Sequence, residues 1–177
     1  MVLLLRFLLH QVLLIVRFNN IENKGDMMIA IFTIVFFMID RVTKIFALKI
    51  KSSIDIIPNF FRLTLAKNTG IAWSLFSNDT VIITIVTMII IFFFIKYILD
   101  NKNGNKLYNV CYAMILGGAF GNLFDRVFLG YVIDFLDFNI FGYDYPIFNL
   151  ADTFIVCGII IIILVGGIRD ECNKRHR

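Results

Sequence analysis

Long apolar runs alternate with polar segments along this chain, and their lengths predict four membrane-spanning helices. A helix needs about 20 apolar residues to cross the roughly 30 Å hydrocarbon core of a bilayer. Apolar runs that reach or approach this length lie at about 27–48, 80–99, 107–127 and 151–168. The strand-like run at 60–66 adds a small β-structure between the first two helices. The pattern therefore predicts an all-α membrane fold, a four-transmembrane-helix bundle with that one β-element.

Composition supports a single membrane domain at 27–168 and excludes several classes of function. The chain is 59% hydrophobic and 17% charged, whereas soluble domains are about 45–50% apolar. The net charge is +4, but no basic run is interleaved with aromatic residues, so a nucleic acid partner is not expected. No Cys pair or Cys/His cluster has zinc spacing, and His10 and His176 lie near the two ends. We therefore expect no metal, no cofactor and no histidine-activated nucleophile.

The distribution of Lys and Arg predicts the orientation, because cytoplasmic loops are enriched in these residues. With both termini inside, the cytoplasmic side holds Lys24, Lys96, Lys102, Lys106, Arg169, Lys174, Arg175 and Arg177, and the outer loops hold Lys49, Lys51, Arg62 and Lys67. This excess favours cytoplasmic termini and a basic cytoplasmic tail at 169–177. The two large loops, 49–79 and 128–150, then face outward.

Residues 1–26 form an N-terminal extension of doubtful status. Its apolar first part is broken by Arg6, His10 and Arg17. It has three interpretations: an interfacial or extra membrane helix, a cleaved signal peptide, or a segment upstream of a true start at Met27 or Met28. We favour the third interpretation, because the polar stretch after residue 18 already makes a complete start for the first span.

Polar side chains gather where the predicted spans meet the outer surface. Ionisable groups inside spans are costly and are functional candidates by default. The group comprises Asp40, Arg41 and Lys44 late in the first span, Asn122, Asp125 and Arg126 late in the third, Asp134 shortly after it, and Asp152 at the start of the fourth. The predicted topology places all of them at the outer half of the membrane, and the inner half has no comparable set.

Each of these residues also has a structural interpretation. Asp40 and Lys44 are four residues apart and can pair on one helix face. Asp125 and Arg126 can form an interfacial pair near a helix end. Asn149 and Asp152 have the spacing of an N-cap residue and its N3 acid. Topology alone does not separate Asp125 from Asp134 as the functional carboxylate.

The third and fourth spans are expected to form a helical hairpin that opens outward, with Asp134 and Asp152 on its two limbs. Together these residues predict aspartic acid–base chemistry. Two carboxylates across a short gap do not both ionise easily, so one keeps a proton. The ionised carboxylate can activate a water, and the protonated one can hydrogen-bond a carbonyl and later protonate the leaving amine.

Five sequence blocks resemble those of bacterial lipoprotein signal peptidases (signal peptidase II). Asp40 to Lys44 is similar to their D-x-x-x-K, and Asn68 to Ser74 to their N-x-G-x-[AG]-[FW]-[GS]. The remaining blocks are Gly117-Gly118-Ala119-Phe120-Gly121-Asn122-Leu123-Phe124-Asp125-Arg126, Val132-Ile133-Asp134-Phe135 and Phe148-Asn149-Leu150-Ala151-Asp152. They occur in the family's order over about 28–168. Trp73, where many members carry Phe, is expected in the outer interfacial belt.

The resemblance implies an aspartic endopeptidase with Asp134 and Asp152 as its catalytic pair. The supporting and substrate-binding positions that it implies are Asn68, Gly70, Asn122, Asp125, Arg126, Asn149, Asp40 and Lys44. The implied substrate is a prolipoprotein whose Cys carries a diacylglyceryl group, cut on the N-terminal side of that Cys. The expected protein is a monomer in the bacterial cytoplasmic (inner) membrane, in contact with lipids, with Asn68 on an extracytoplasmic β-cradle.

Three rival interpretations remain open from the residues themselves. A small transporter or channel subunit would carry polar groups through the whole depth of the bundle. A non-enzymatic membrane scaffold would use Gly117 and Gly121, a small-xxx-small pair, for helix packing alone. A different intramembrane aspartic peptidase would carry a G-x-G-D block, which this sequence lacks.

Overall fold

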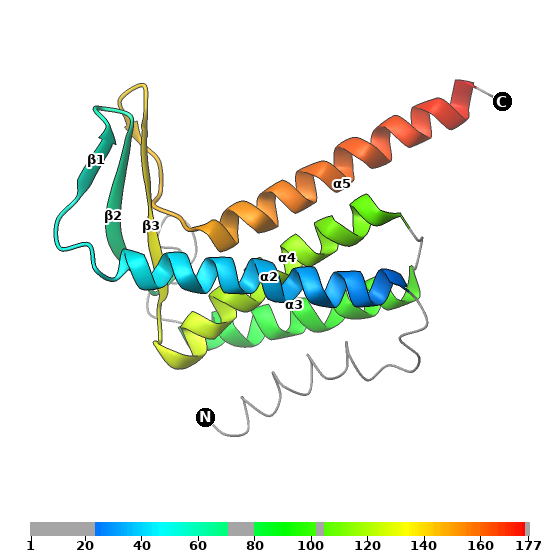
Figure 1. Ribbon diagram of the computed structural model, residues 1–177, viewed down its shortest axis with the longest axis horizontal. Coiled ribbons are helices and arrows are strands. Elements are labelled where there is room, and N and C mark those ends of the chain that lie inside the picture. The colour runs from blue at the N-terminus through cyan, green and yellow to red at the C-terminus, as the bar shows by residue number, and fades with distance from the viewer. Residues whose placement is uncertain (1–23, 71–79, 102–104, 176–177) are drawn as a thin grey trace.

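The computed structural model describes residues 24–70, 80–101 and 105–175, and its helices coincide with the apolar runs (Figure 1). The described helices are α2 (Lys24–Ala47), α3 (Thr80–Asp100), α4 (Lys106–Phe128) and α5 (Leu150–Arg175). α5 continues beyond the predicted span end at 168 into the segment expected as a tail. Residues 1–23 of the N-terminal extension, and Trp73, lie outside the described residues.

Two of the described helices, α3 and α4, are long and apolar enough to cross a membrane. The described part of α5 has a shorter apolar stretch, Leu150–Gly166. Large apolar side chains also lie on the outside of the bundle, among them Ile34, Ile45, Phe46, Ile90, Phe93, Ile163 and Leu164. Exposed apolar side chains in this number indicate a membrane or protein contact rather than a face toward water.

α4 is the central helix and packs against α2, α3 and α5. Its glycines let two neighbours approach closely. A Cβ added at Gly117 would lie 2.6 Å from the Cβ of Phe36 on α2, and one at Gly118 would overlap the carbonyl oxygen of Ala151 on α5. Gly121 faces the Asp40 carboxylate on α2 so closely that a Cβ would overlap it. The glycines therefore hold three helices together and also leave room for a buried charge.

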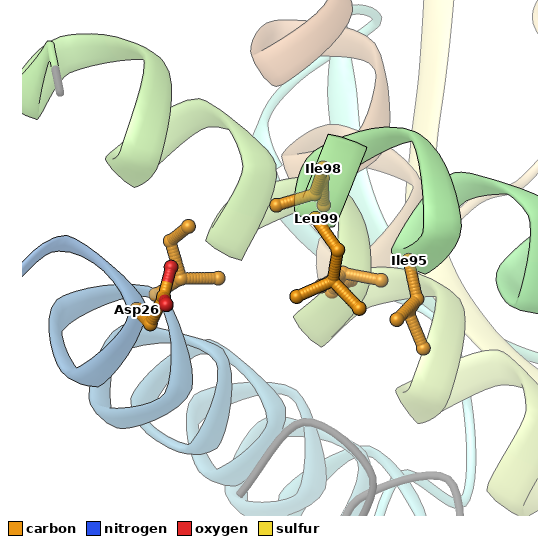
Figure 2. A pocket seen from close by; sticks show the side chains of 6 residues that line it. Asp26, Ile95, Ile98 and Leu99 are labelled. Atoms are coloured by element: carbon orange, nitrogen blue, oxygen red, sulfur yellow. The ribbon is translucent and has the colours of Figure 1, made fainter. Parts of the chain in front are cut away.

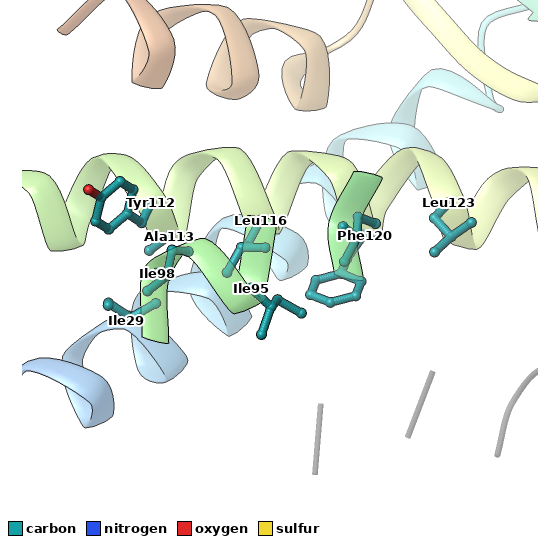
Figure 3. Close-up of a cluster of buried hydrophobic side chains, with 9 residues drawn as sticks. Ile29, Ile95, Ile98, Tyr112, Ala113, Leu116, Phe120 and Leu123 are labelled. Carbon is teal, nitrogen blue, oxygen red and sulfur yellow. The ribbon is translucent and has the colours of Figure 1, made fainter. Parts of the chain in front are cut away.

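A cluster of apolar side chains fills the space between α2, α3 and α4. Figure 3 shows Ile29, Ile95, Ile98, Tyr112, Ala113 and Leu116 packed between α2, α3 and α4, with Phe120 and Leu123 further along α4. A small cavity of about 20 Å³ lies beside this core, lined by Asp26, Ile29, Ile95, Ile98, Leu99 and Leu116 (Figure 2). It has space for little more than a water molecule.

A four-stranded antiparallel sheet lies across the end of the bundle where α2 ends and α5 begins (Figure 1). Its strands, in sheet order, are β1 (Ile54–Ile57), β2 (Phe61–Asn68), β3 (Val132–Ile140) and β4 (Tyr143–Asp144). The expected strand at 60–66 is confirmed as β2.

The all-α prediction, with a β-element only between the first two helices, is incomplete. The segment predicted as a loop at 128–150 supplies β3 and β4. β3 pairs with β2, a partner far away in the sequence, with Ala66 opposite Asp134 and Asn68 opposite Val132. Because this pairing is long-range, the local apolar pattern did not reveal it.

Candidate active site

Asp134 lies near the start of β3 and is held by two asparagine amides. The Asn149 side chain donates to Asp134 Oδ1 at 2.6 Å. The Asn68 side chain, on β2, donates to Asp134 Oδ2 at 2.9 Å. Asp134 is 2% exposed, so both carboxylate oxygens are fixed inside the protein by neutral donors. This position is on a strand and not on a limb of a helical hairpin, because β3 begins soon after α4 ends.

Asp152 lies in the first turn of α5 and forms a reciprocal cap with Asn149. Asn149 Oδ1 accepts from the Asp152 backbone N–H at 3.0 Å. Asp152 Oδ2 accepts from the Asn149 backbone N–H at 3.2 Å. This capping box confirms the structural interpretation of the Asn149 and Asp152 spacing. The same contacts fix the orientation of the Asp152 carboxylate.

Two asparagines connect the carboxylates to each other. Asn149 Nδ2 donates both to Asp134 and to Asn122 Oδ1, the latter at 3.1 Å. Asn122 Nδ2 in turn donates to Asp152 Oδ1 at 2.8 Å. The two aspartates therefore belong to one hydrogen-bonded unit built from α4, β3 and α5. Of the predicted site residues, Asn68, Asn122 and Asn149 are the ones that contact these aspartates.

A second buried cluster lies next to this unit and contains two acids and two bases. Lys44 Nζ lies 3.0 Å from Asp40 Oδ2 and 2.9 Å from Asp125 Oδ2. Arg41 lies 2.6 Å from Asp125 and 3.0 Å from Asp40. The pair expected between Asp40 and Lys44 is confirmed. Asp125 pairs with Arg41 and Lys44 across the helices, and not with its neighbour Arg126 as the interfacial-pair interpretation proposed.

The cluster is linked to the backbone and to the aspartate unit. Asp40 Oδ1 accepts from the Ala151 backbone N–H at 3.2 Å, and Asp125 Oδ2 accepts from the Ile133 N–H at 3.2 Å. Lys44 Nζ also donates to Asn122 Oδ1 at 2.9 Å. The ions therefore fix the residues that immediately precede Asp134 and Asp152. We call the group Asp40, Arg41, Lys44 and Asp125 the ion cluster.

Arg126 and Gly70 lie at the edge of the aspartate unit. The Gly70 N–H donates to Asn68 Oδ1 at 3.0 Å, and an Arg126 Nη2 lies 3.5 Å from the Gly70 carbonyl oxygen. Arg126 Nε is buried and has no hydrogen-bond partner within the described part of the chain. Gly70 therefore contacts Asn68, and Arg126 contacts Gly70 while interacting electrostatically with Asp152 and Asp134.

Arg41 is the member of the ion cluster that the sequence interpretation did not place among the site residues. It lies beside Asp40 in the same block, and only the tertiary contact with Asp125 shows its role. Its guanidinium also lies 4.9 Å from the ring centroid of Phe124 on α4. The available signal was a second basic residue in an apolar span, which is rare without a partner.

Burial and the neighbouring Asp152 charge raise the pKa of Asp134 from 3.8 to about 6. Folding therefore favours the protonated form of Asp134 between about pH 4 and pH 6. The unfolded chain gives up this proton near pH 4, and the folded chain keeps it until near pH 6. The free energy of unfolding therefore falls as pH rises through this window.

We expect Asp134→Asn to remove this part of the pH dependence. The pKa difference corresponds to about 3 kcal/mol of unfolding free energy in the wild type between pH 4 and pH 7. Unfolding in detergent, followed over that range for both proteins, measures the difference in slope. Parallel curves for the wild type and the variant would contradict the prediction.

Comparison with known proteins gives a consistent result over most of the chain. The family model described as signal peptidase (SPase) II matches residues 29–166. A lipoprotein signal peptidase of Staphylococcus aureus (strain bovine RF122 / ET3-1) is 37% identical over 155 residues, covering 86% of this chain and 93% of that protein. The lipoprotein signal peptidase of S. aureus strain MRSA252 is also 37% identical over 155 residues.

Solved structures agree with the sequence comparison. A bacterial membrane enzyme determined by the in meso method at 2.3 Å resolution superposes with a TM-score of 0.74 and 34% identity, covering 84% of this chain and 92% of that one. A second, at 1.9 Å resolution, gives a TM-score of 0.69 with 36% identity, covering 77% of this chain and 90% of that one. The helices and the antiparallel sheet thus form a membrane enzyme fold.

Proposed function

We propose that this chain, which belongs to the signal peptidase II family, removes signal peptides from prolipoproteins with Asp134 and Asp152 as its catalytic pair. The observation that carries the assignment is the bridge through Asn149, which bonds Asp134 with its side chain and caps the helix that begins with Asp152. Asp125 is a weaker candidate, because its oxygens are occupied by Arg41, Lys44 and a backbone N–H.

The two aspartates differ in environment, and this difference supports separate roles. Asp152 accepts from the Asn122 amide and from a backbone N–H in the first turn of α5, where the helix dipole favours negative charge. Asp134 lies on β3, outside a helix, and its two oxygens accept from the side-chain amides of Asn149 and Asn68. We assign the ionised role to Asp152 and the protonated role to Asp134.

The resulting reaction is peptide hydrolysis with a balanced proton transfer. Asp152 accepts a proton from a water molecule while the oxygen of that water attacks the scissile carbonyl carbon. Asp134 donates its proton to the carbonyl oxygen. The tetrahedral intermediate collapses, the C–N bond breaks, and the proton held by Asp152 passes to the leaving amine. The oxygen-bound proton returns to Asp134. Asn68, Asn122 and Asn149 keep the carboxylates oriented through the cycle.

The proposed placement is a four-span protein in the bacterial cytoplasmic membrane, with both termini cytoplasmic and the sheet outside. α3 and α4 meet the length and composition of spans. For α2 and α5 the support is their outward-facing apolar side chains, such as Phe46 and Ile163. Lys24 and Asp26 lie in the first turn of α2, at its end, and its other charged residues belong to the ion cluster beside α4, so these charges do not oppose a membrane position.

The proposed substrate carries a diacylglyceryl group on the Cys after the cleavage site. This finer proposal rests on the five matched blocks and on the position of the aspartates beside an apolar bundle. Acyl chains can remain among lipids while the peptide bond reaches Asp134 and Asp152. A transporter or channel is less well supported, because the buried ion pairs that the structure describes all lie at one end of the bundle and do not continue through its depth.

The test is cleavage by the purified full chain in phospholipid vesicles. One precursor carries the diacylglyceryl group on its Cys, and a matched precursor has the same sequence without the lipid. We expect the lipid-modified precursor alone to be cut, leaving a lipidated Cys at the new N-terminus, as read by mass spectrometry. Equal cleavage of both precursors, or a cut at another bond, would show that the lipid does not define the substrate.

A further inference from the structure

The turn between β3 and β4 carries a fully exposed aromatic side chain in a strained backbone conformation. Ile140 pairs with Tyr143, so Phe141 and Gly142 form a two-residue hairpin turn. Their φ values are 52° and 86°. Turns of this kind favour Asn-Gly, because both central residues take positive φ. Phe141 is 106% exposed, so packing of its ring against the described part of the chain does not offset the backbone strain.

More apolar and aromatic side chains lie around this turn. The turn between β1 and β2 is adjacent, since Phe61 pairs with Phe138 and the Asn139 N–H donates to the Phe60 carbonyl. The two turns together form what we call the sheet tip, with exposed Ile57, Phe60, Ile140, Phe141, Tyr143 and Tyr145. An exposed patch of this composition indicates a contact outside the chain.

The acids at the sheet tip have hydrogen-bonded partners, and one base, Arg62, is shared between Asp137 and Asp144. Asp144 accepts from the Asn139 side chain at 2.9 Å and from Arg62 at 3.4 Å. Arg62 also bonds Asp137 at 2.5 Å. Neither acid is without a partner, and the net negative charge that remains lies on Asp144, which is exposed to the aqueous side of the interface. The two tyrosines of the tip have the apolar body and polar end that suit the membrane interface.

The position of the sheet indicates what the tip meets. Figure 1 shows the strands running across the helix axes, with both turns extending beyond the side of the bundle where α5 begins. In the proposed orientation the helix axes cross the membrane, so the strands lie along its outer surface and the tip lies over lipid beside the bundle. Phe141 is seven residues along β3 from Asp134, about 23 Å at ~3.3 Å per residue, which separates it from the catalytic pair.

We propose that the sheet tip is a membrane anchor, in which the Phe141 ring inserts into the outer leaflet of the bilayer. The inference rests on the proposed membrane orientation and adds a lipid contact outside the helices. Transfer of the Phe141 ring from water into the lipid interface is favourable, and it offsets the free-energy cost of the strained backbone. The anchor fixes the height of the sheet, and with it Asn68 and Asp134, relative to the membrane surface.

The test places a single fluorescent Trp at the tip. In a Trp73→Phe background, Phe141→Trp is reconstituted in phosphatidylcholine vesicles whose acyl chains carry bromine at a shallow or a deep position. We expect blue-shifted emission, quenching mainly by the shallow bromine and protection from aqueous iodide. Emission of a water-exposed Trp, quenched by iodide and not by bromine, would overturn the anchor. Protection that arises only after addition of a lipid-modified prolipoprotein would assign the tip to substrate and also overturn it.

A matched control separates the anchor from the orientation on which it rests. Phe93→Trp, on the exposed apolar face of α3, should be quenched mainly by the deep bromine. If this control is quenched and the Phe141→Trp variant is not, the helices span the bilayer and the anchor alone is wrong. Precursor cleavage by the same vesicles reports separately on the proposed activity.

Phe141→Asn then tests for a packing role within the protein. Asn adopts positive φ more readily than Phe, and Asn-Gly suits this turn. We expect the variant to unfold in detergent at the same temperature as the wild type or at a higher one. A lower unfolding temperature would show that Phe141 stabilises the chain itself, and it would overturn the anchor.

Discussion

Asp134→Asn and Asp152→Asn should each reduce cleavage of a lipid-modified prolipoprotein by on the order of 10³-fold or more. Each change removes one proton-transfer group, a loss of about 10²–10⁴-fold, and it also ends the sharing of one proton between two carboxylates. Both variants should accumulate in the membrane, because Asn keeps the size of Asp. The measurement is the initial rate of cleavage in vesicles at equal amounts of folded enzyme.

Asp137→Asn is the matched control for the catalytic pair. Asp137 is on the same strand as Asp134 and is equally buried, but its carboxylate bonds Arg62 and lies opposite Arg62 in the sheet register. We expect this variant to retain cleavage. Full cleavage by either Asp134→Asn or Asp152→Asn would rule out the assigned pair. Loss of cleavage in all three variants would point to damage of the sheet.

Lys44→Met should cause the largest loss of stability among single changes in the ion cluster. Lys44 is 1% exposed and contacts two buried carboxylates, Asp40 and Asp125. Met fills a similar volume without charge, so the cluster is left with two acids and one base. Breaking a buried ion pair in this way costs about 3–5 kcal/mol. Unfolding followed in detergent should show a midpoint lower by on the order of 10 °C.

Two further variants identify the cause of that loss. Lys67→Gln removes an exposed lysine on β2 that contacts the Tyr131 ring, and it should change stability little. Adding Asp125→Asn to Lys44→Met restores charge balance. The double variant should therefore be less unstable than the sum of the two single changes. If Lys44→Met is as stable as Lys67→Gln, the ion cluster does not support the fold.

The helices could be predicted from the sequence because their signal is local. An apolar run either has the length of a span or does not, and the four predicted runs correspond to α2, α3, α4 and α5. The strand β2 was also visible, since Phe60 to Ala66 has the composition and pattern of a strand. The strand β3 was not visible in the sequence. Gly130 and Gly142 lie on either side of it and suggested a loop, and the segment is a strand because it pairs with β2.

For the candidate site, too, the sequence predicted the features that depend on local signals. Polar residues in apolar runs are costly alone, so the sequence by itself indicated that Asp40, Lys44, Asn122 and Asp125 have partners and lie at one end of the bundle. The matched blocks added the family and the choice of Asp134 and Asp152. Those conclusions depend on residue type and order, which the sequence carries completely.

Only the tertiary structure decided which partner each polar residue takes. It joined Asp125 to Arg41 and Lys44, and it joined Asp134 to Asp152 through Asn149 and Asn122. It also placed Phe141, with its side chain exposed, at a strained turn. Hydrogen bonds and ion pairs depend on distances of about 3 Å between atoms from different elements. Such distances arise from helix packing and strand register, for which one chain's residue order gives no direct signal.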